Sequence, residues 1–194
     1  MTPALPFPCI SLSLIDSPLD PLRAAWTRHG LAALWMQAQR HGPADEALAA
    51  MPAAASMPGA LQAWDRRLRD WLERYFRGES VELAQADLPL DLHGTDFQRR
   101  VWQALQGLPW GRSSTYGDIA AALGQPRASR AVGAAVGRNP VSILVPCHRI
   151  LGRDGSLTGY AGGLERKRHL LRLEGLLAPP AARSGDLFVD EALA

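Results

Sequence analysis

The sequence predicts an α/β protein of two modules: a small antiparallel sheet with one helix, then a mainly helical module that carries a helix-turn-helix. Three observations lead to this fold class. Residues 9–36 hold short alternating or apolar runs separated by turn signals, which is typical of a strand meander. Residues 64–76 carry apolar side chains at helical spacing. Residues 116–139 contain two short helical patterns joined by a Gly/Pro turn.

The expected sheet begins at residues 9–15, where Ile10, Leu12 and Leu14 alternate with other residues. Such alternation predicts a half-buried strand with these three side chains on one face. The next elements are expected in the order turn 17–18, strand 19–26, turn 28–30, strand 31–36 and a loop with at most one short helix at 41–60.

The helix expected after this loop has an apolar stripe from Trp64 to Phe76, and Gly78 ends it. The sequence that follows has the composition of a connector, so we place the module boundary there. The predicted parts are an N-terminal module over 1–92 with a connector from about 78, a second module over 93–175 and a tail over 176–194.

In the second module, helix starts are predicted by two capping-box spacings, at Thr95 and at Thr115. The expected helices cover about 95–108, 116–123, 126–139 with Pro126 at the first position, and 164–174. The third of these helices has mostly Ala and Gly on one face and Arg130 as a long side chain. Such a face indicates either tight packing against another helix or close approach to a DNA minor groove, which is ~6 Å wide.

The charge distribution favours a polyanion as partner of the second module. The chain has a net charge of only +2, but residues 1–92 carry 8 basic and 11 acidic side chains, whereas residues 93–175 carry 12 basic and 5 acidic ones. Segregated positive charge of this kind is typical of a nucleic-acid-binding surface.

Several other classes are disfavoured by the sequence. No apolar run approaches the roughly 20 residues that span a bilayer, and the first residues lack the basic start of a signal peptide. The two cysteines, Cys9 and Cys147, are far apart, so a disulfide framework is not expected. We therefore expect a protein of the reducing cytoplasm that binds no membrane. We expect no cofactor and no required metal, while a zinc shared by Cys9 and a histidine stays open.

The stretch Val145-Pro146-Cys147-His148-Arg149-Ile150 is the strongest candidate for chemistry. The preceding residues 142–145 are expected to form a short apolar strand that delivers Cys147 to a pocket. His148 and Arg149 beside it are both groups that favour a thiolate. The glycine-rich residues 158–163 fit neither the P-loop nor the dinucleotide fingerprint, so nucleotide binding is rejected in favour of a loop bordering a pocket.

These residues resemble one known family. Arg138-Asn139-Pro140, Ile143-Leu144-Val145-Pro146-Cys147-His148-Arg149, residues 155–163 and Leu173-Glu174-Gly175 are similar to the motifs of the O6-alkylguanine-DNA alkyltransferases. The similarity is strong over about 95–175 and loose before it. It implies a ribonuclease H-like N-terminal module and a winged helix-turn-helix C-terminal module.

The resemblance also implies direct reversal of O6-alkylguanine damage, and possible action on O4-alkylthymine, by irreversible transfer of the alkyl group to Cys147. A relay of Glu174, His148 and a water would deprotonate the thiol. The remaining roles implied are those of Asn139 as a brace, Tyr116 and the Tyr160–Ala161 backbone at the guanine O6, and the carbonyls of Cys147 and Ile150 at its amine.

The partner implied is double-stranded alkylated DNA bound through its minor groove, with the damaged base flipped out of the stack. Arg130 resembles the arginine that fills the gap, and Gly117, Arg127 and Arg153 are candidates for backbone contacts. We expect a monomer in solution, and cooperative assembly on DNA stays open.

Three positions depart from the family pattern. Ser142 and Thr158 replace Pro and Gly of animal members, which predicts a different tolerance for alkyl groups, and Ala161 lacks a hydroxyl that some members have. The alternative function is a damage-sensing or transcriptional DNA-binding module without repair. A Cys/His hydrolase is disfavoured because the chain has no nucleophile elbow.

Overall fold

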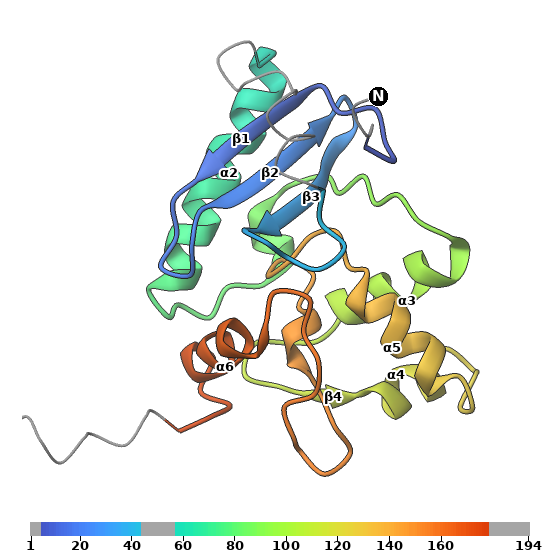
Figure 1. Ribbon diagram of the computed structural model, residues 1–194. Coiled ribbons are helices and arrows are strands. Elements are labelled where there is room, and N and C mark those ends of the chain that lie inside the picture. The colour runs from blue at the N-terminus through green and yellow to red at the C-terminus, as the bar shows by residue number, and fades with distance from the viewer. Residues whose placement is uncertain (1–4, 44–56, 179–194) are drawn as a thin grey trace, which may run out of the picture.

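The computed structural model describes residues 5–43 and 57–178. Its first part is a three-stranded antiparallel sheet in the order β1-β2-β3 (Figure 1), built from β1 (Ser11–Ile15), β2 (Leu22–Thr27) and β3 (Gly30–Met36). The predicted meander is confirmed. The loop expected over 41–60 falls mostly outside the described residues.

Helix α2 (Gly59–Phe76) lies along one face of this sheet (Figure 1). It begins five residues before the predicted Trp64 and ends where Gly78 adopts a positive φ of 79°. Leu68 and Leu72 pack into the core between helix and sheet, and Trp64 stacks on Trp26 with ring centroids 6.5 Å apart. The amphipathic pattern read from the sequence therefore marks the face that the sheet covers.

The predicted apolar face of the first strand was wrong. Ser11, Ser13 and Ile15 point into the protein, whereas Leu14 is 57% exposed and Ile10 is 38% exposed. The reversal has a polar cause: the Ser13 hydroxyl donates to Asp65 of α2 at 2.5 Å. A hydroxyl with a buried hydrogen-bond partner can occupy an inward position that alternation alone assigns to an apolar residue.

The second part of the chain is helical (Figure 1). Both predicted capping boxes are present, since the side chains of Thr95 and Thr115 accept hydrogen bonds from the third residue of their helices. The elements are the 3-10 helix η2 (Leu83–Ala86), α3 (Asp96–Gln106), β4 (Ser114–Thr115), α4 (Tyr116–Ala122), α5 (Ser129–Gly137), the 3-10 helix η3 (Cys147–Arg149), β5 (Ile150–Leu151) and α6 (Leu164–Leu173).

Two local predictions in this part were wrong. Helix α5 begins at Ser129 with Ala128 as its N-cap, so Pro126 lies in the preceding turn rather than at the first helical position. Residues 142–145 form turns instead of a strand, and Ile143 has a positive φ of 71°. All four are buried, and a short buried apolar run has no period that separates a strand from a packed turn.

The sheet fixes the chain on both sides of residues 142–145. The N–H of Leu34 in β3 donates to the carbonyl of Pro140, and the N–H of Ser142 donates back to the carbonyl of Leu34, both at 2.9 Å. The N–H of Arg40 donates to the carbonyl of Ala161 at 2.8 Å. The N-terminal part thus holds the segment before Cys147 and the glycine-rich loop after it.

One continuous apolar core runs through both parts, from Leu22 and Leu68 to Val132 and Leu170. The division of the chain at residue 92 therefore stays a prediction. In the part of the chain described here, no helix combines the length and apolarity needed to cross a membrane.

Candidate active site

Cys147 opens the short helix η3 and is buried, with 5% of its surface exposed. The amide nitrogen Nδ2 of Asn139 lies 3.0 Å from its Sγ, and the same nitrogen donates to the Val145 carbonyl at 2.8 Å. Asn139 also accepts the N–H of Val141 through Oδ1 at 3.1 Å. A single amide side chain therefore holds the buried turn in shape and places an N–H on the sulfur.

The thiol at this position is protonated at rest. Burial raises the pKa of Cys147 above its ordinary value of 9.0, although the Asn139 hydrogen bond and the positive charge of Lys167 oppose the shift. Because a thiolate is the nucleophilic form, any reaction at Sγ needs a base that takes the proton.

The candidate for this base is the next residue of the chain. His148 is fully buried, and its Nε2 lies 2.8 Å from Oε1 of Glu174, the C-cap residue that follows helix α6. Its Nδ1 is buried and has no hydrogen-bond partner among the described residues. If Nε2 carries the proton that meets Glu174, Nδ1 presents a free lone pair, which is the state required of a proton acceptor.

Two further side chains hold the Glu174 carboxylate. Arg149 donates from Nε to Oε2 at 2.8 Å and from a terminal nitrogen to Oε1 at 3.0 Å, and it also donates to the Leu108 carbonyl. Tyr75 of helix α2 donates its hydroxyl to Oε1 at 2.8 Å. The carboxylate is therefore the centre of a buried cluster of four side chains, which we name the Glu174 cluster: Tyr75, His148, Arg149 and Glu174.

The charge states in this cluster follow from the contacts. Burial would raise the pKa of Glu174, but the hydrogen bonds and charges of His148 and Arg149 lower it to about 2, so the residue is an anion. Burial lowers the pKa of His148 below 6.5 and outweighs the opposing effect of Glu174. At neutral pH, His148 is therefore neutral and Glu174 is charged.

Sequence reasoning missed three residues of this region. Arg149 was considered only as a neighbour that favours a thiolate, and Tyr75 and Lys167 were given no role in a site. Lys167 is fully buried, and its Nζ donates to the carbonyls of Ile150 and Thr158 at 2.5 and 2.9 Å. Burial lowers its pKa to about 8. A lysine in a basic run of a helix gives no signal of burial, so only the structure reveals these contacts.

Of the residues expected around a substrate base, Tyr116, Tyr160 and Ala161 line a cavity of about 680 Å³ next to the glycine-rich loop, whereas Cys147 and Ile150 are not among its lining residues. The hydroxyl of Tyr116 lies 3.2 Å from that of Thr158, and the Tyr160 hydroxyl faces Met36 Sδ at 4.0 Å. The lining includes Tyr116, Gly133, Arg138, Gly159, Tyr160 and Ala161. Both carbonyls expected to bind an amine already accept one hydrogen bond, that of Cys147 from Ile150 N–H and that of Ile150 from Lys167.

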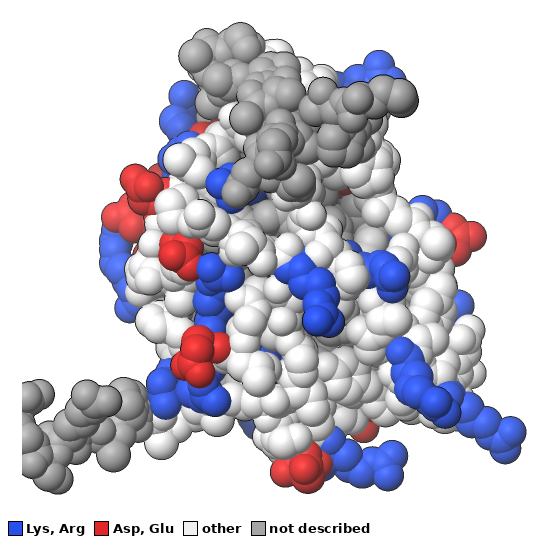
Figure 2. Space-filling model, in the orientation of Figure 1, with Lys and Arg blue, Asp and Glu red and all other residues white. Residues whose placement is uncertain are grey.

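The residues expected to contact DNA lie in the C-terminal, helical part of the chain. Arg127 and Arg130 belong to the turn and helix after α4, Gly117 lies in α4, and Arg153 lies in the turn after β5; the three arginines are exposed. On the face drawn in Figure 2, basic side chains reach outward on the side of α4 and α5. This placement is compatible with a helix-turn-helix that meets a phosphate backbone.

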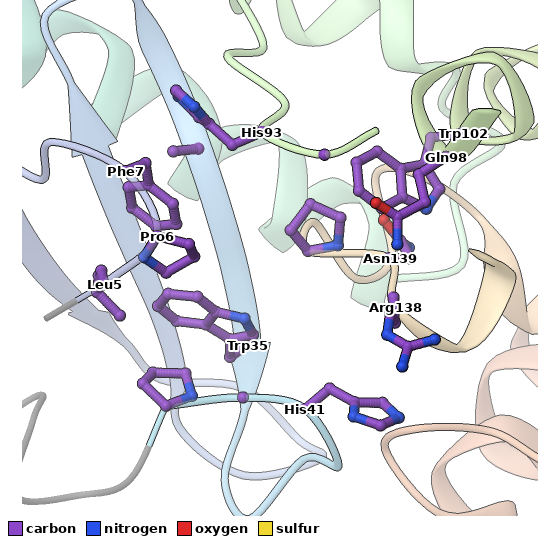
Figure 3. A pocket seen from close by; sticks show the side chains of 15 residues that line it. Leu5, Pro6, Phe7, Trp35, His41, His93, Gln98, Trp102, Arg138 and Asn139 are labelled. Carbon is purple, nitrogen blue, oxygen red and sulfur yellow. The ribbon is translucent and has the colours of Figure 1, made fainter. Parts of the chain in front are cut away.

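A second cavity, of about 580 Å³, lies between β3 and the start of α3 (Figure 3). Phe7 and Trp35 line it from the sheet side, and Trp102 and Asn139 line it from the helical side. It meets the thiol site only through Asn139. Within residues 5–43 and 57–178, no group of three or more His, Cys, Asp or Glu side chains is placed to hold a metal ion.

Comparison with known proteins identifies the family. Residues 96–176 match the model of the family described as "6-O-methylguanine DNA methyltransferase, DNA binding domain". The chain is 47% identical over 165 residues to the methylated-DNA–protein-cysteine methyltransferase of Mycobacterium tuberculosis strain H37Rv, covering 85% of this chain and 92% of that protein. The chain belongs to the methylated-DNA–protein-cysteine methyltransferase family.

Two further relatives agree with this family. The protein of the same name from Salmonella typhimurium is 54% identical over 125 residues, which are 64% of this chain and 67% of that protein. The crystal structure of Mycobacterium tuberculosis OGT in complex with DNA superposes with a TM-score of 0.71 at 44% identity, covering 85% of this chain and 92% of that one.

Proposed function

We propose that this protein repairs DNA by direct reversal, moving the alkyl group of an O6-alkylguanine irreversibly onto Cys147. The observation that carries the proposal is the buried thiol of Cys147 followed directly by the buried His148–Glu174 pair, in a chain of this family. Because the product is a stable thioether, each molecule reacts once. The partner is double-stranded DNA.

The first step is removal of the thiol proton. His148 takes it through a water at its free Nδ1, while Nε2–H stays bonded to Glu174. The resulting imidazolium is stabilised by the Glu174 carboxylate beside it. Asn139, whose Nδ2 lies 3.0 Å from Sγ, stabilises the thiolate. The thiolate then attacks the alkyl carbon, so the S–C bond forms as the C–O6 bond breaks.

The second requirement is stabilisation of the leaving guanine O6 as it gains negative charge. We assign this role to the Tyr116 hydroxyl and to the backbone N–H groups of Tyr160 and Ala161, which line the same cavity. The carbonyls of Cys147 and Ile150 have a second lone pair each, which can accept the exocyclic amine of the base.

Binding to DNA is assigned to the helix-turn-helix formed by α4 and α5 and to the turn that holds Arg153, which acts as the wing. The small residues of α5 allow approach to the minor groove. The target base is flipped toward Cys147, and Arg130 fills the gap in the stack. Gly117 and Arg127 contact the DNA backbone.

The finer features of the fold belong to the same proposal. We assign residues 1–92 to a ribonuclease H-like module and 93–175 to a winged helix-turn-helix module. The protein acts as a monomer in the cytoplasm.

The test is to mix the protein with duplex DNA containing O6-methylguanine and to determine the mass of the intact protein. Transfer predicts that each molecule gains the mass of one methylene and that the reaction stops when protein is exhausted. Cys147→Ser should bind the DNA and remain unmodified. Tight binding of the wild type with an unchanged mass would favour a non-repairing, damage-sensing module.

The role of Arg130 is tested with Arg130→Ala. The variant should capture duplex substrate about tenfold less well, on the scale of one lost stacking contact, and should react normally with free O6-methylguanine base. Equal losses on both substrates would contradict the proposed role in the stack.

A further inference from the structure

We propose that Tyr75, a residue of helix α2 in the N-terminal part, is a positioning residue for alkyl transfer: its hydroxyl holds the Glu174 carboxylate against His148 and keeps the relayed proton on the imidazole. The inference rests on the proposed function. It adds to the proposed reactive residues of the C-terminal part a residue of the N-terminal part, since Tyr75 lies 99 positions before Glu174 in the sequence.

The Tyr75 hydroxyl lies beside the hydrogen bond between the Glu174 carboxylate and the His148 imidazole. Its oxygen lies 2.8 Å from Oε1 of Glu174 and 3.4 Å from Nε2 of His148. Oε1 is the same oxygen that lies 2.8 Å from Nε2. The hydroxyl therefore binds the carboxylate oxygen that receives the His148 N–H, and no part of Tyr75 is exposed to solvent.

The hydroxyl acts as a donor throughout the working pH range. Burial, and then the negative charge of Glu174, raise the pKa of Tyr75 well above 10. The oxygen is consequently never a phenolate that would repel the carboxylate. Its proton has an acceptor within hydrogen-bond distance in Oε1, which is consistent with a fixed donation to this oxygen.

The distribution of donors on the carboxylate indicates what the hydroxyl does. Oε2 receives Nε of Arg149, whereas Oε1 receives Tyr75, His148 and the second Arg149 nitrogen. A donor on Oε1 withdraws electron density from the atom nearest the His148 proton. It thereby makes Glu174 a weaker base and leaves the proton on the imidazole, which must later release it.

Three charged groups of the described residues act on His148. Glu174 favours the imidazolium, whereas Arg149 and Lys167 oppose it. Removal of the Tyr75 hydroxyl leaves these three charges in place and makes Oε1 more basic. The imidazolium is then stabilised more strongly, so the pKa of His148 rises. As the pH falls, Nδ1 therefore becomes protonated, and unable to accept the thiol proton, at a higher pH than in the wild type.

The tyrosine ring has a separate, structural role that its hydroxyl does not share. The ring stacks on Trp71 at 5.3 Å and meets Trp110 edge-on at 5.2 Å between centroids. Tyr75→Phe keeps these ring contacts and removes only the oxygen. The variant therefore separates packing from positioning.

The experiment compares wild type and Tyr75→Phe in single-turnover transfer from duplex DNA containing O6-methylguanine, from pH 5 to pH 8. The expected result is a rate about three- to tenfold lower at neutral pH, the size of effect typical of the loss of one hydrogen bond. In the plot of transfer rate against pH, the fall in rate on the acid side (the acid limb) should shift to higher pH. The affinity for DNA should be unchanged. A site-specific 3-fluorotyrosine at position 75, a stronger donor of the same shape, should shift the limb to lower pH.

The matched control is Ser13→Ala, which deletes another buried hydroxyl that donates to a carboxylate, Asp65 of the same helix. It should lower stability without changing the rate or the acid limb. The proposal is overturned if Tyr75→Phe behaves like Ser13→Ala, or if the fluorinated protein leaves the limb in place. Failure of the wild type to transfer would instead overturn the proposed function, so the two failures are distinct.

Discussion

Two buried carboxylates lie at helix α2: Asp65 is a residue of the helix, and Glu174 accepts a hydrogen bond from its residue Tyr75. Only Glu174 also contacts the candidate base His148. Asp65, near the middle of the helix, accepts the Ser13 hydroxyl and Nε of Arg69, and the Trp26 indole N–H in turn donates to Ser13. Glu174, near the end of the helix, accepts Tyr75, Arg149 and His148. Both carboxylates accept hydrogen bonds from a hydroxyl and from an arginine.

The difference lies in what the neighbours leave unsatisfied. Around Asp65, each polar atom of the cluster of Ser13, Trp26, Asp65 and Arg69 has a protein partner or access to solvent. In the Glu174 cluster, the buried Nδ1 of His148 lacks a partner among the described residues. A buried polar atom left unsatisfied is costly, and here it belongs to the residue that directly follows the only buried thiol of the described chain. The orphaned nitrogen, rather than the buried charge, distinguishes the reactive cluster.

The largest effect is expected from Glu174→Gln. Transfer should slow by at least about 100-fold, because the imidazolium of His148 loses its counter-ion and general-base catalysis contributes factors of this size. The variant should also lose about 3–5 kcal/mol of stability, since Arg149 is left as an uncompensated buried charge. Single-turnover rates on folded protein separate the two losses. A rate within twofold of wild type would refute the reactive role of Glu174.

Arg149→Lys is expected to reduce the transfer rate about tenfold. Lysine keeps the charge but cannot bond both carboxylate oxygens from one fork, so Glu174 is held less firmly against His148. The matched change on the other carboxylate is Arg69→Lys. Because the Arg69 side chain is 40% exposed, this change should alter stability by less than about 1 kcal/mol. Rates and thermal unfolding of both variants check the contrast, and equal effects on transfer would break it.

The pH dependence of stability should carry the signature of Glu174. Its pKa is lowered from 4.5 to about 2, so the folded state stays ionised while the unfolded chain takes up a proton. The resulting stabilisation is fully present above pH 4.5 and is lost as the pH falls toward 2, with a size of roughly 3 kcal/mol. The difference in unfolding free energy between wild type and Glu174→Gln should shrink over this window. A difference independent of pH would contradict the ion pair.

The smallest effect on transfer is expected from Asp65→Asn. The variant weakens bonds to Ser13 and Arg69 and should cost about 1–3 kcal/mol of stability. Its transfer rate, measured on folded protein, should equal that of wild type. A slower rate would show that the sheet–helix interface also controls the thiol, and the comparison between the two carboxylates would fail.

The sequence was informative where the signal is local. The capping residues Thr95 and Thr115, the stripe of α2 and the Cys147-His148 pair were all readable from their neighbours. The buried turn at 142–145 was not, because its shape depends on a contact between distant parts of the chain, the hydrogen bond that the Ser142 N–H donates to the Leu34 carbonyl.

The same reason explains the residues that were overlooked in the candidate site. Tyr75 belongs to an ordinary apolar stripe, and only folding brings its hydroxyl to a residue 99 positions away. Arg149 was noticed as a neighbour of Cys147, but its partner Glu174 is separated by 25 positions. The resemblance to the family supplied Glu174, whose burial no local pattern of charge could predict.

The most direct test of the account uses the two cysteines of the chain. Cys9 is the more exposed thiol and donates to the Ser11 carbonyl at 3.3 Å, whereas Cys147 is buried beside His148. After reaction with duplex DNA carrying O6-methylguanine, peptide mass mapping should place the whole methyl label on Cys147 and leave Cys9 free. A label on Cys9, or one divided between both, would contradict the claim that the buried thiol is the activated one.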